Sequence, residues 1–358
     1  YDAKEYGSIL TIPPQDWDAL YARFDEVADE SSFHRESIRK NLLPLVRVAQ
    51  TLAQKYDVVV TNPPYMGASN MNSDLSEYVK KYYPDSKSDL FAVFIEVCSR
   101  MAKQNGYQAM ITQHAWMFLS SFEKLREKMM LTETVSMAHL GARAFEEIGG
   151  EVVQTTAFVR YTNHMDGYNG TYCRLIEPTT QQGKEEMFLA GQNRYNANQD
   201  DFAKIPGSPV AYWASKAMIG DFESGKSLSS YAEPKQGMAT MDNNKYLRMW
   251  YEVNKNLCYF HAKSQEEAKK SGGKWFPYNK GGEYRKWYGN FNYLVNWEND
   301  GKALKLDAAR IYGSYSKRIY NTQYFFLPSI TWSKISSGSF SVRCIPDGCL
   351  FDVAGCSI

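Results

Sequence analysis

The feature that most constrains this chain is an apolar strand that runs almost directly into a rigid polar loop. Val58-Val59-Val60 is a β-branched run, and Asn62-Pro63-Pro64-Tyr65 follows one residue later. The two prolines fix φ and remove two backbone N–H donors, so the loop presents carbonyl acceptors on a stiff frame. Open α/β sheets bind their ligands at the carboxyl ends of strands. We therefore expect Asn62 to lie at a ligand-binding edge of a sheet.

Helix and strand patterns alternate over the first part of the chain. Apolar residues at helical spacing predict helices at 16–55, 75–82, 88–105 and 121–130. Short apolar runs predict strands at 57–61, 107–112, 134–140 and 152–161. This alternation predicts an α/β fold with a mainly parallel sheet.

The pattern changes after about residue 165. Clusters of Gly, Asn, Tyr and Trp replace the periodic helices, and helical spacing remains only near 212–224, 245–257 and 301–312. A chain of 358 residues is long enough for two hydrophobic cores. We therefore predict two domains, 1–165 and 166–358, of which the second is a mixed, loop-rich α+β domain.

Composition and cysteine usage are typical of a globular cytoplasmic protein. The hydrophobic share of 44% and the charged share of 23% argue against wholesale disorder. No apolar run approaches the ~18 residues of a membrane-spanning helix, and no basic-then-apolar leader opens the chain. Because it begins at Tyr1 without a methionine, we expect a piece of a longer polypeptide. The six cysteines form no Cys-x-x-Cys pair, so we expect reduced structural thiols rather than a metal site.

The net charge of +1 hides a gradient along the chain. Residues 245–318 hold fifteen Lys/Arg and seven Asp/Glu, a local charge of +8, whereas residues 1–60 hold seven and ten, a charge of −3. A basic segment interleaved with Trp and Tyr suits binding to a phosphate backbone. A solvated protein surface is the alternative interpretation of the same charges.

The Asn-Pro-Pro-Tyr tetrapeptide has the groups needed to hold a planar amine. The side-chain oxygen of Asn62 and the carbonyl of Pro63 form an acceptor pair for its two hydrogens, and the Tyr65 ring can stack on the base that carries it. Proline pairs also mark ordinary loops. The context favours function, because a capped apolar helix from Ser88-Asp89 and a strand leading into Gln113-His114-Ala115-Trp116 follow in order.

This succession resembles the amino-group DNA methyltransferases, whose signature is Asn/Asp-Pro-Pro followed by an aromatic residue. The resemblance implies a partial Rossmann-like sheet, S-adenosylmethionine as the methyl donor and adenine N6 in double-stranded DNA as the acceptor. Asn62 and Pro63 would bind the target amine, and Tyr65 and Phe145 would stack on the flipped base.

The same resemblance assigns cofactor contacts. Pro64 and Phe94 fall where the family packs against the adenine of S-adenosylmethionine, and Asp89 falls at the polar position that opens the following helix. Core packing is the alternative for Phe94 and Phe145. His114 stands where the family usually has proline, which favours a structural role.

One family motif is missing from the sequence. A glycine-rich turn of the Asp-Pro-x-x-Gly-x-Gly type should precede the tetrapeptide, and residues 1–57 contain nothing of that form. We therefore expect the chain alone to bind S-adenosylmethionine weakly and to be inactive by itself.

Three segments of the second half, 236–244, 286–301 and 330–336, resemble the target-recognition domain of large bacterial adenine methyltransferases. The segments Asn62–Gly67, Asp85–Glu96 and Gln113–Leu119 resemble one such group, the PglX type of BREX phage-defence systems. This resemblance implies other phage-defence proteins as partners. Lys280, Arg285, Lys286 and Lys334 are candidate phosphate contacts, with a plain surface role as the alternative for each.

Three other functions remain open. A restriction–modification fusion would carry a nuclease elsewhere in the protein. Protein-glutamine methyltransferases share the tetrapeptide, because an amide amine is planar too, but they lack a long basic second domain. A DNA-recognition or assembly subunit would bind DNA while methylation is dispensable for defence.

Overall fold

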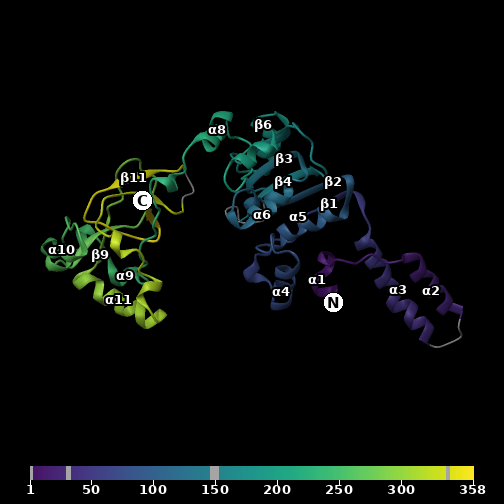
Figure 1. Ribbon diagram of the computed structural model, residues 1–358, viewed down its shortest axis with the longest axis horizontal. Helices are drawn as coiled ribbons and strands as arrows, with labels where there is room; N and C mark the ends of the chain where they lie inside the picture. The colour runs from purple at the N-terminus through teal and green to yellow at the C-terminus, as the bar shows by residue number, and fades with distance from the viewer. Residues whose placement is uncertain (1–2, 30–33, 146–152, 336–338) are drawn as a thin grey trace. The chain divides into compact units, whose positions relative to one another are not determined.

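The computed structural model describes residues 3–29, 34–145, 153–335 and 339–358. The chain divides into two compact units, Tyr1–Gly225 and Lys226–Ile358 (Figure 1). Among the described residues, no helix is both long enough and apolar enough to cross a membrane.

The first unit is built on a six-stranded mixed sheet. Its strands run in the order β1-β2-β4-β3-β5-β6, with the bounds β1 Tyr56–Thr61, β2 Ala102–Gln113, β3 Glu133–Ala142, β4 Gln154–Tyr161, β5 Gly170–Arg174 and β6 Arg194–Ala197. The pairs β1–β2 and β3–β5 are parallel, while β2–β4, β3–β4 and β5–β6 are antiparallel. The predicted strands are confirmed, but the prediction of a mainly parallel sheet is wrong, because β4 runs against both of its neighbours.

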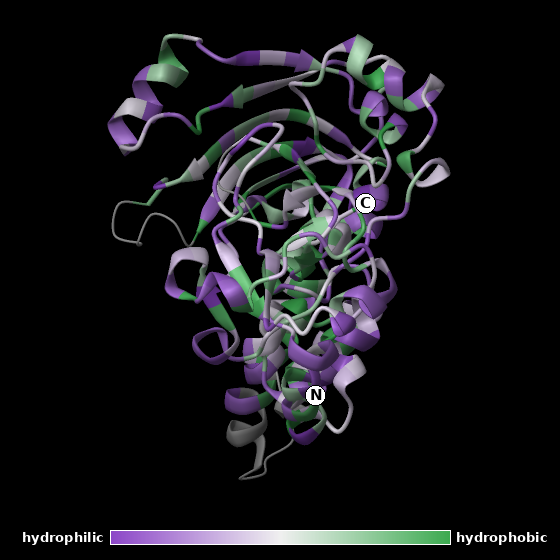
Figure 2. Ribbon diagram, turned by 90° about the vertical axis from the view of Figure 1, so that its left-hand side faces the viewer, coloured by the Kyte–Doolittle hydropathy of each residue, from purple (hydrophilic) through white to green (hydrophobic). Residues whose placement is uncertain are grey.

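Helices cover one face of this sheet. The helices of the unit are α1 Ala3–Tyr6, α2 Trp17–Asp29, α3 His34–Ala53, α4 Ser73–Tyr82, α5 Leu90–Met101, α6 Glu123–Met129, α7 Gln181–Leu189 and α8 Lys216–Ser224. Side chains alternate along the strands, so Met110, Met137 and Phe158 point into a core shared with Phe91 of α5 and Leu125 of α6. In Figure 2 the helices and loops at the periphery are largely hydrophilic.

The other face of the sheet is open in the part of the chain that the structure describes. Val58 and Val60 of β1 expose 54% and 71% of their surface. Ala109, Ala138 and Ala157, on the neighbouring strands, are half-buried on the same face. The face is therefore largely apolar, with alanines on β2, β3 and β4 beside the larger valines of β1.

The division between the units falls 60 residues after the predicted boundary near 165. β5 pairs with β3 and β6 pairs with β5, so the sheet continues past that point. Tyr172 of β5 also stacks on Tyr212, with ring centroids 5.0 Å apart and planes 6° apart. These contacts hold residues 166–225 in the first unit; the functional assignment of the two predicted domains stays a prediction.

The second unit contains two small sheets. A four-stranded sheet has the order β12-β8-β9-β7 and a three-stranded sheet has the order β11-β10-β13. Their strands are β7 Leu247–Met249, β8 Trp275–Asn279, β9 Tyr293–Asn296, β10 Ser329–Ser333, β11 Val342–Ile345, β12 Leu350–Phe351 and β13 Gly355–Ser357. Buried Asn279 links the sheets, since its Nδ2 donates to Thr331 Oγ1 at 2.7 Å. The predicted α+β character is confirmed.

Helices of the second unit are short except for one. They are α9 Asn243–Tyr246, α10 Gln265–Lys270 and α11 Glu298–Tyr312. The predicted helix at 301–312 is confirmed, but that at 245–257 is wrong, because β7 and two 3₁₀ turns occupy the segment. Leu247 and Met249 pair with β9, and this pairing overrides the local helical spacing.

Candidate active site

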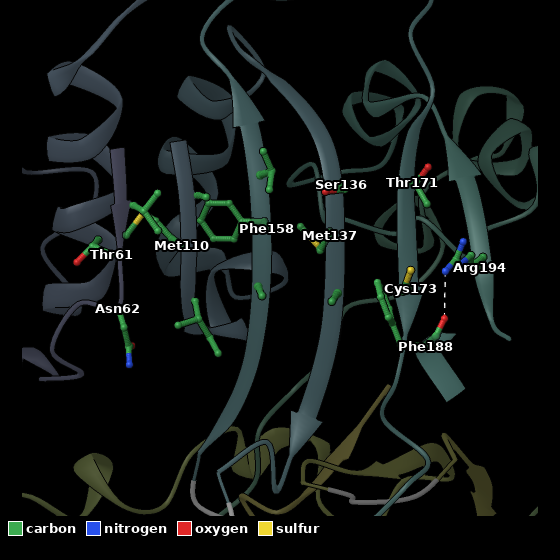
Figure 3. Close-up of a pocket in the computed structure, with 16 residues that line it drawn as sticks. Thr61, Asn62, Met110, Ser136, Met137, Phe158, Thr171, Cys173, Phe188 and Arg194 are labelled. Atoms are coloured by element: carbon green, nitrogen blue, oxygen red, sulfur yellow. Dashed lines mark hydrogen bonds between the residues drawn. The ribbon is translucent and has the colours of Figure 1, made fainter. Parts of the chain in front are cut away.

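The Asn62–Tyr65 loop leaves the sheet at the carboxyl end of β1. β1 runs parallel to β2, with Thr61 opposite Met110, so the loop lies beside the segment of β2 that leads into the 3₁₀ turn His114–Met117. Asn62 is exposed, and its side chain borders a hollow on the open sheet face (Figure 3). The structure thus places Asn62 at the predicted edge, while its chemical role stays a prediction.

Asp89 fastens this loop to α5. Its Oδ1 accepts a hydrogen bond from the backbone N–H of Met66 at 3.0 Å and another from Phe91 N–H at 3.3 Å. Asp89 is thereby the N-cap of α5. Leu90 N–H in turn donates to Met66 O at 3.0 Å. Two motifs that are separate in the sequence are therefore joined by the Asp89 carboxyl group and by a backbone hydrogen bond.

Burial and hydrogen bonding act in opposite directions on the pKa of Asp89. The side chain is 9% exposed, and desolvation raises the pKa of the carboxyl above its usual value, although hydrogen bonds from Phe91, Met66 and Leu90 N–H lower it. Because Oδ1 accepts hydrogen bonds from two backbone N–H groups, the carboxyl group holds the loop against the start of α5. The predicted cofactor contact of Asp89 stays a prediction.

Tyr65 is half-buried beneath the loop. Its hydroxyl donates to Ile111 O at 3.3 Å, and its ring meets Phe91 edge-on at 6.2 Å and 84°. Burial raises the pKa of Tyr65 to about 12, so the phenol is neutral near pH 7. The ring is thus held by its hydroxyl and by Phe91, and its predicted role in base stacking stays a prediction.

The other predicted cofactor and base contacts are more scattered. Pro64 is exposed. Phe94 is half-buried and packs against two core clusters, so its contacts are those of a core side chain. Phe145 is half-buried in the turn after β3. No ring contact joins Phe145 to Tyr65 among the described residues.

The hollow beside Asn62 has a volume of about 590 Å³. Figure 3 shows Thr61 and Asn62 at one side of it and Phe188 and Arg194 at the other, where Arg194 donates to Phe188 O at 3.0 Å. The described lining is mostly apolar and includes no carboxylate. The lining does not include Pro64, Asp89 or Phe94. The predicted contacts with S-adenosylmethionine therefore stay predictions.

A buried polar chain near the same sheet edge was not predicted. His114 Nδ1 lies 2.8 Å from His139 Nε2, and His139 Nδ1 lies 3.0 Å from Tyr212 Oη. Burial lowers the pKa of His139 to about 3 and also lowers that of His114, so both rings are neutral. The contacts agree with a structural role for His114. No sequence signal connects residues that lie 25 and 73 positions apart.

The candidate phosphate contacts lie on two segments of the second unit that touch each other. Ser333, next to Lys334, donates from Oγ to Gly282 O at 2.7 Å. The loop that carries Arg285 and Lys286 therefore lies against the end of β10. Arg285, Lys286 and Lys334 are exposed, whereas Lys280 is half-buried, with Nζ 5.5 Å from the Tyr293 ring.

Comparisons with known proteins agree with this geometry. Residues 11–141 match the family model described as Eco57I restriction-modification methylase. Over 99% of its length, the chain is 48% identical to the adenine-specific methyltransferase PglX of Lacticaseibacillus casei (strain Zhang) and 41% identical to the adenine-specific methyltransferase BrxX of Escherichia coli O9:H4 (strain HS). The chain covers 30% and 28% of those two proteins, less than a third of each.

A solved structure shares the fold. The chain is similar to the Type IIL restriction-modification enzyme MmeI, solved in complex with DNA, with a TM-score of 0.56 and 11% identity over 87% of this chain and 42% of that one. At this level of identity the likeness shows a shared α/β fold. The family model and this solved structure agree in that both describe restriction-modification enzymes, to which the chain is similar.

Proposed function

We propose that this chain supplies the amine-binding part of a site-specific DNA adenine-N6 methyltransferase. The observation that carries the proposal is the loop at the end of β1, where Asp89 fixes Met66 N–H at 3.0 Å and Asn62 stays exposed at the sheet edge. The relatives named adenine-specific methyltransferases support adenine as the target.

The chemistry follows from the acceptor pair. An adenine N6 amine is a weak nucleophile, because its lone pair is delocalised into the ring. The Asn62 side-chain oxygen and the Pro63 carbonyl accept its two hydrogens, which favours a tetrahedral nitrogen and stabilises the positive charge that develops on it. The neutral Tyr65 ring offsets part of the cost of flipping the base, which is a few kcal/mol. Phe145 is the candidate for the second stacking surface.

S-adenosylmethionine supplies an electrophilic methyl group when it is bound. Pro64, Asp89 and Phe94 are the candidate contacts of this chain with it. The apolar hollow beside Asn62 does not include these three residues. We therefore propose amine capture and loop positioning as the main contribution of this chain, with these three residues at the edge of the donor site.

The second unit is proposed to bind double-stranded DNA. Arg285, Lys286 and Lys334 are exposed, and a hydrogen bond between Ser333 and Gly282 joins the two segments that carry them; Lys280 precedes the first of these segments. The surplus of basic over acidic residues between 245 and 318 supports this placement. By its similarity to PglX and BrxX, the complete protein would act in the cytoplasm, marking a specific site on host DNA together with other phage-defence proteins.

An Asn62→Ala variant of the complete protein tests the enzyme function. We expect N6-methyladenine at the recognised site to disappear from the host genome, while an Asn70→Ala variant, exposed in the following loop, keeps it. Methylation-sensitive sequencing provides the measurement. Persistent marking in Asn62→Ala contradicts the proposal.

A second candidate function is DNA recognition without a need for methylation. The exposed basic residues of the second unit favour this function. If Asn62→Ala removes the methyl mark while phage exclusion survives in the same cells, this non-catalytic function is supported.

A further inference from the structure

The loop between β8 and β9 displays large aromatic side chains to solvent. Tyr284, Trp287 and Tyr288 expose 51%, 67% and 66% of their surface. The loop is closed at its base, because Asn290 Nδ2 donates to Glu283 O at 3.0 Å. Residues 283–290, here called the aromatic loop, are therefore a defined element.

Trp287 is held rigidly within the aromatic loop. Its N–H donates to Val342 O at 3.0 Å, and its carbonyl accepts from Cys344 N–H at 2.8 Å. Both backbone groups of Trp287 are thus bonded to β11. Its φ is +73°, a conformation that bulky side chains rarely adopt. A bulky residue held in this conformation with its indole largely exposed indicates that the side chain has a role other than packing.

Positive charge surrounds the exposed rings. Lys286 Nζ lies 5.9 Å from the Tyr284 ring and 6.0 Å from the Trp287 ring. Behind the loop, Arg343 is 1% exposed and forms no ion pair with a carboxylate in the described ranges. Its guanidinium donates only to Ser341 Oγ and Ser333 Oγ, at 3.4 and 3.3 Å, within those ranges. The loop and its support therefore carry net positive charge.

A second exposed pair continues the same surface. Trp250 and Tyr251, 60% and 66% exposed, follow β7, and Trp250 N–H donates to Asn292 O at 3.0 Å. Phe291, next to Asn292, packs against Tyr288 with ring centroids 4.9 Å apart. Flat rings interleaved with cations fit a nucleic acid better than an apolar protein partner, because bases offer π-faces and phosphates offer negative charge.

We propose that the aromatic loop binds DNA at a locally opened base step, with the Trp287 indole stacked on an exposed base and Arg285 and Lys286 at the flanking phosphates. In a regular duplex each base face is covered by its neighbours, so an inserted ring requires an unstacked step. The proposal rests on the proposed function in that the chain acts on DNA. It adds a preference for distorted DNA and a residue that reads it.

Fluorescence anisotropy with the whole chain tests this preference. One labelled duplex is regular, and a second of the same sequence carries a single bulged thymine, which has no exocyclic amine for Asn62 to bind. We expect the unaltered chain to bind the bulged duplex more tightly than the regular one. Trp287→Ala should weaken binding to the bulged duplex about fivefold or more, while Trp287→Phe should retain most of it.

Two control variants distinguish the loss of stacking from the loss of charge and from the general effect of removing an exposed ring. Tyr231→Ala removes a ring that is 71% exposed in the same unit and should leave both affinities unchanged. Lys286→Gln should weaken binding to both duplexes alike and reduce the salt dependence by about one phosphate contact.

Equal binding of the bulged duplex by Trp287→Ala and the unaltered chain overturns the proposal. Self-association that Trp287→Ala abolishes, with no change in DNA binding, also overturns it and assigns the surface to protein contact. None of these measurements uses a methyl donor. The Asn62→Ala chain should keep the bulge preference, so failure of this inference and failure of the proposed enzyme are distinguishable.

Discussion

Asp89→Ala is the perturbation that best tests how the candidate site is held. The change removes the N-cap of α5, which costs about 1 kcal/mol. It also leaves the partly buried Met66 N–H without its acceptor at 3.0 Å, which costs about 1–3 kcal/mol. We therefore expect a loss of about 2–4 kcal/mol in the free energy of unfolding. Urea unfolding followed by circular dichroism measures it.

Ser215→Ala provides the matched control. Ser215 Oγ caps α8 by accepting from Met218 N–H at 3.2 Å, without a second tether to a distant loop. Its loss should cost only the cap, about 1 kcal/mol. If Asp89→Ala and Ser215→Ala are equally destabilised, the tether between the loop and α5 contributes nothing and the reasoning is refuted.

Asp89→Asn separates the acceptor from the charge. The amide oxygen can replace Oδ1 for both N–H donors, and the change removes a buried charge. Because burial raises the folded-state pKa of Asp89 above 3.8, the protonated form favours folding. That contribution is present below pH 3.8 and is lost as the pH rises through the folded pKa. At pH 7, Asp89→Asn should thus be at least as stable as the unaltered chain, and a loss as large as that of Asp89→Ala contradicts this account.

Three further predictions concern other parts of the chain. Since the folded pKa of His139 is about 3, below its unfolded value of 6.5, its contribution is present above pH 6.5 and is lost as the pH falls toward 3. The loss reaches about 1.4 kcal/mol per pH unit, and His139→Gln should flatten a pH series of unfolding energies. A Cβ at Gly237 would meet Phe351 O at 1.8 Å, so Gly237→Ala should lower stability by several kcal/mol, about 3 or more. Gly220→Ala, in open space within α8, should raise it by about 0.5–1 kcal/mol, and thermal unfolding compares the two. Isothermal titration should show weak binding of S-adenosylmethionine, because residues 1–57 contain no glycine-rich turn of the family type. Tight binding by residues 1–358 would refute this expectation.

Local patterns in the sequence were sufficient for the strands β1 to β4 and for the helices α4 to α6 of the first unit, but not for β5, α7 and β6. β1 and its loop follow from a β-branched run that ends in Asn62-Pro63-Pro64, and α5 follows from an apolar run capped by Asp89. The mixed sheet did not follow, because strand direction depends on pairing partners. β4 lies between β2 and β3, and nothing in its own residues encodes that place.

Prediction from the sequence fails most clearly for contacts between residues that lie far apart in the chain. The hydrogen bond between Asp89 and Met66 joins residues 23 positions apart. Motif matching assigns the two residues to separate motifs and so does not predict their contact. The three left-handed residues Asn299, Asp300 and Gly301, with φ of 51°, 59° and 67°, follow from residue types that tolerate this conformation. Trp287 does not belong to those types, so its left-handed backbone had no signal in the sequence.

The proposed amine capture and donor binding place different demands on this chain. The acceptor pair of Asn62 and Pro63 requires β1, its loop and the Asp89 tether, and these are joined by hydrogen bonds within the first unit. The sheet face next to Asn62 presents Val58 and Val60, 54% and 71% exposed. Burying such surface is favourable by roughly 25 cal/mol per Å², so this face suits packing against another apolar surface. We therefore expect amine capture to depend on the loop and its tether, which Asp89→Ala tests, and donor binding to depend on polar contacts away from this apolar face.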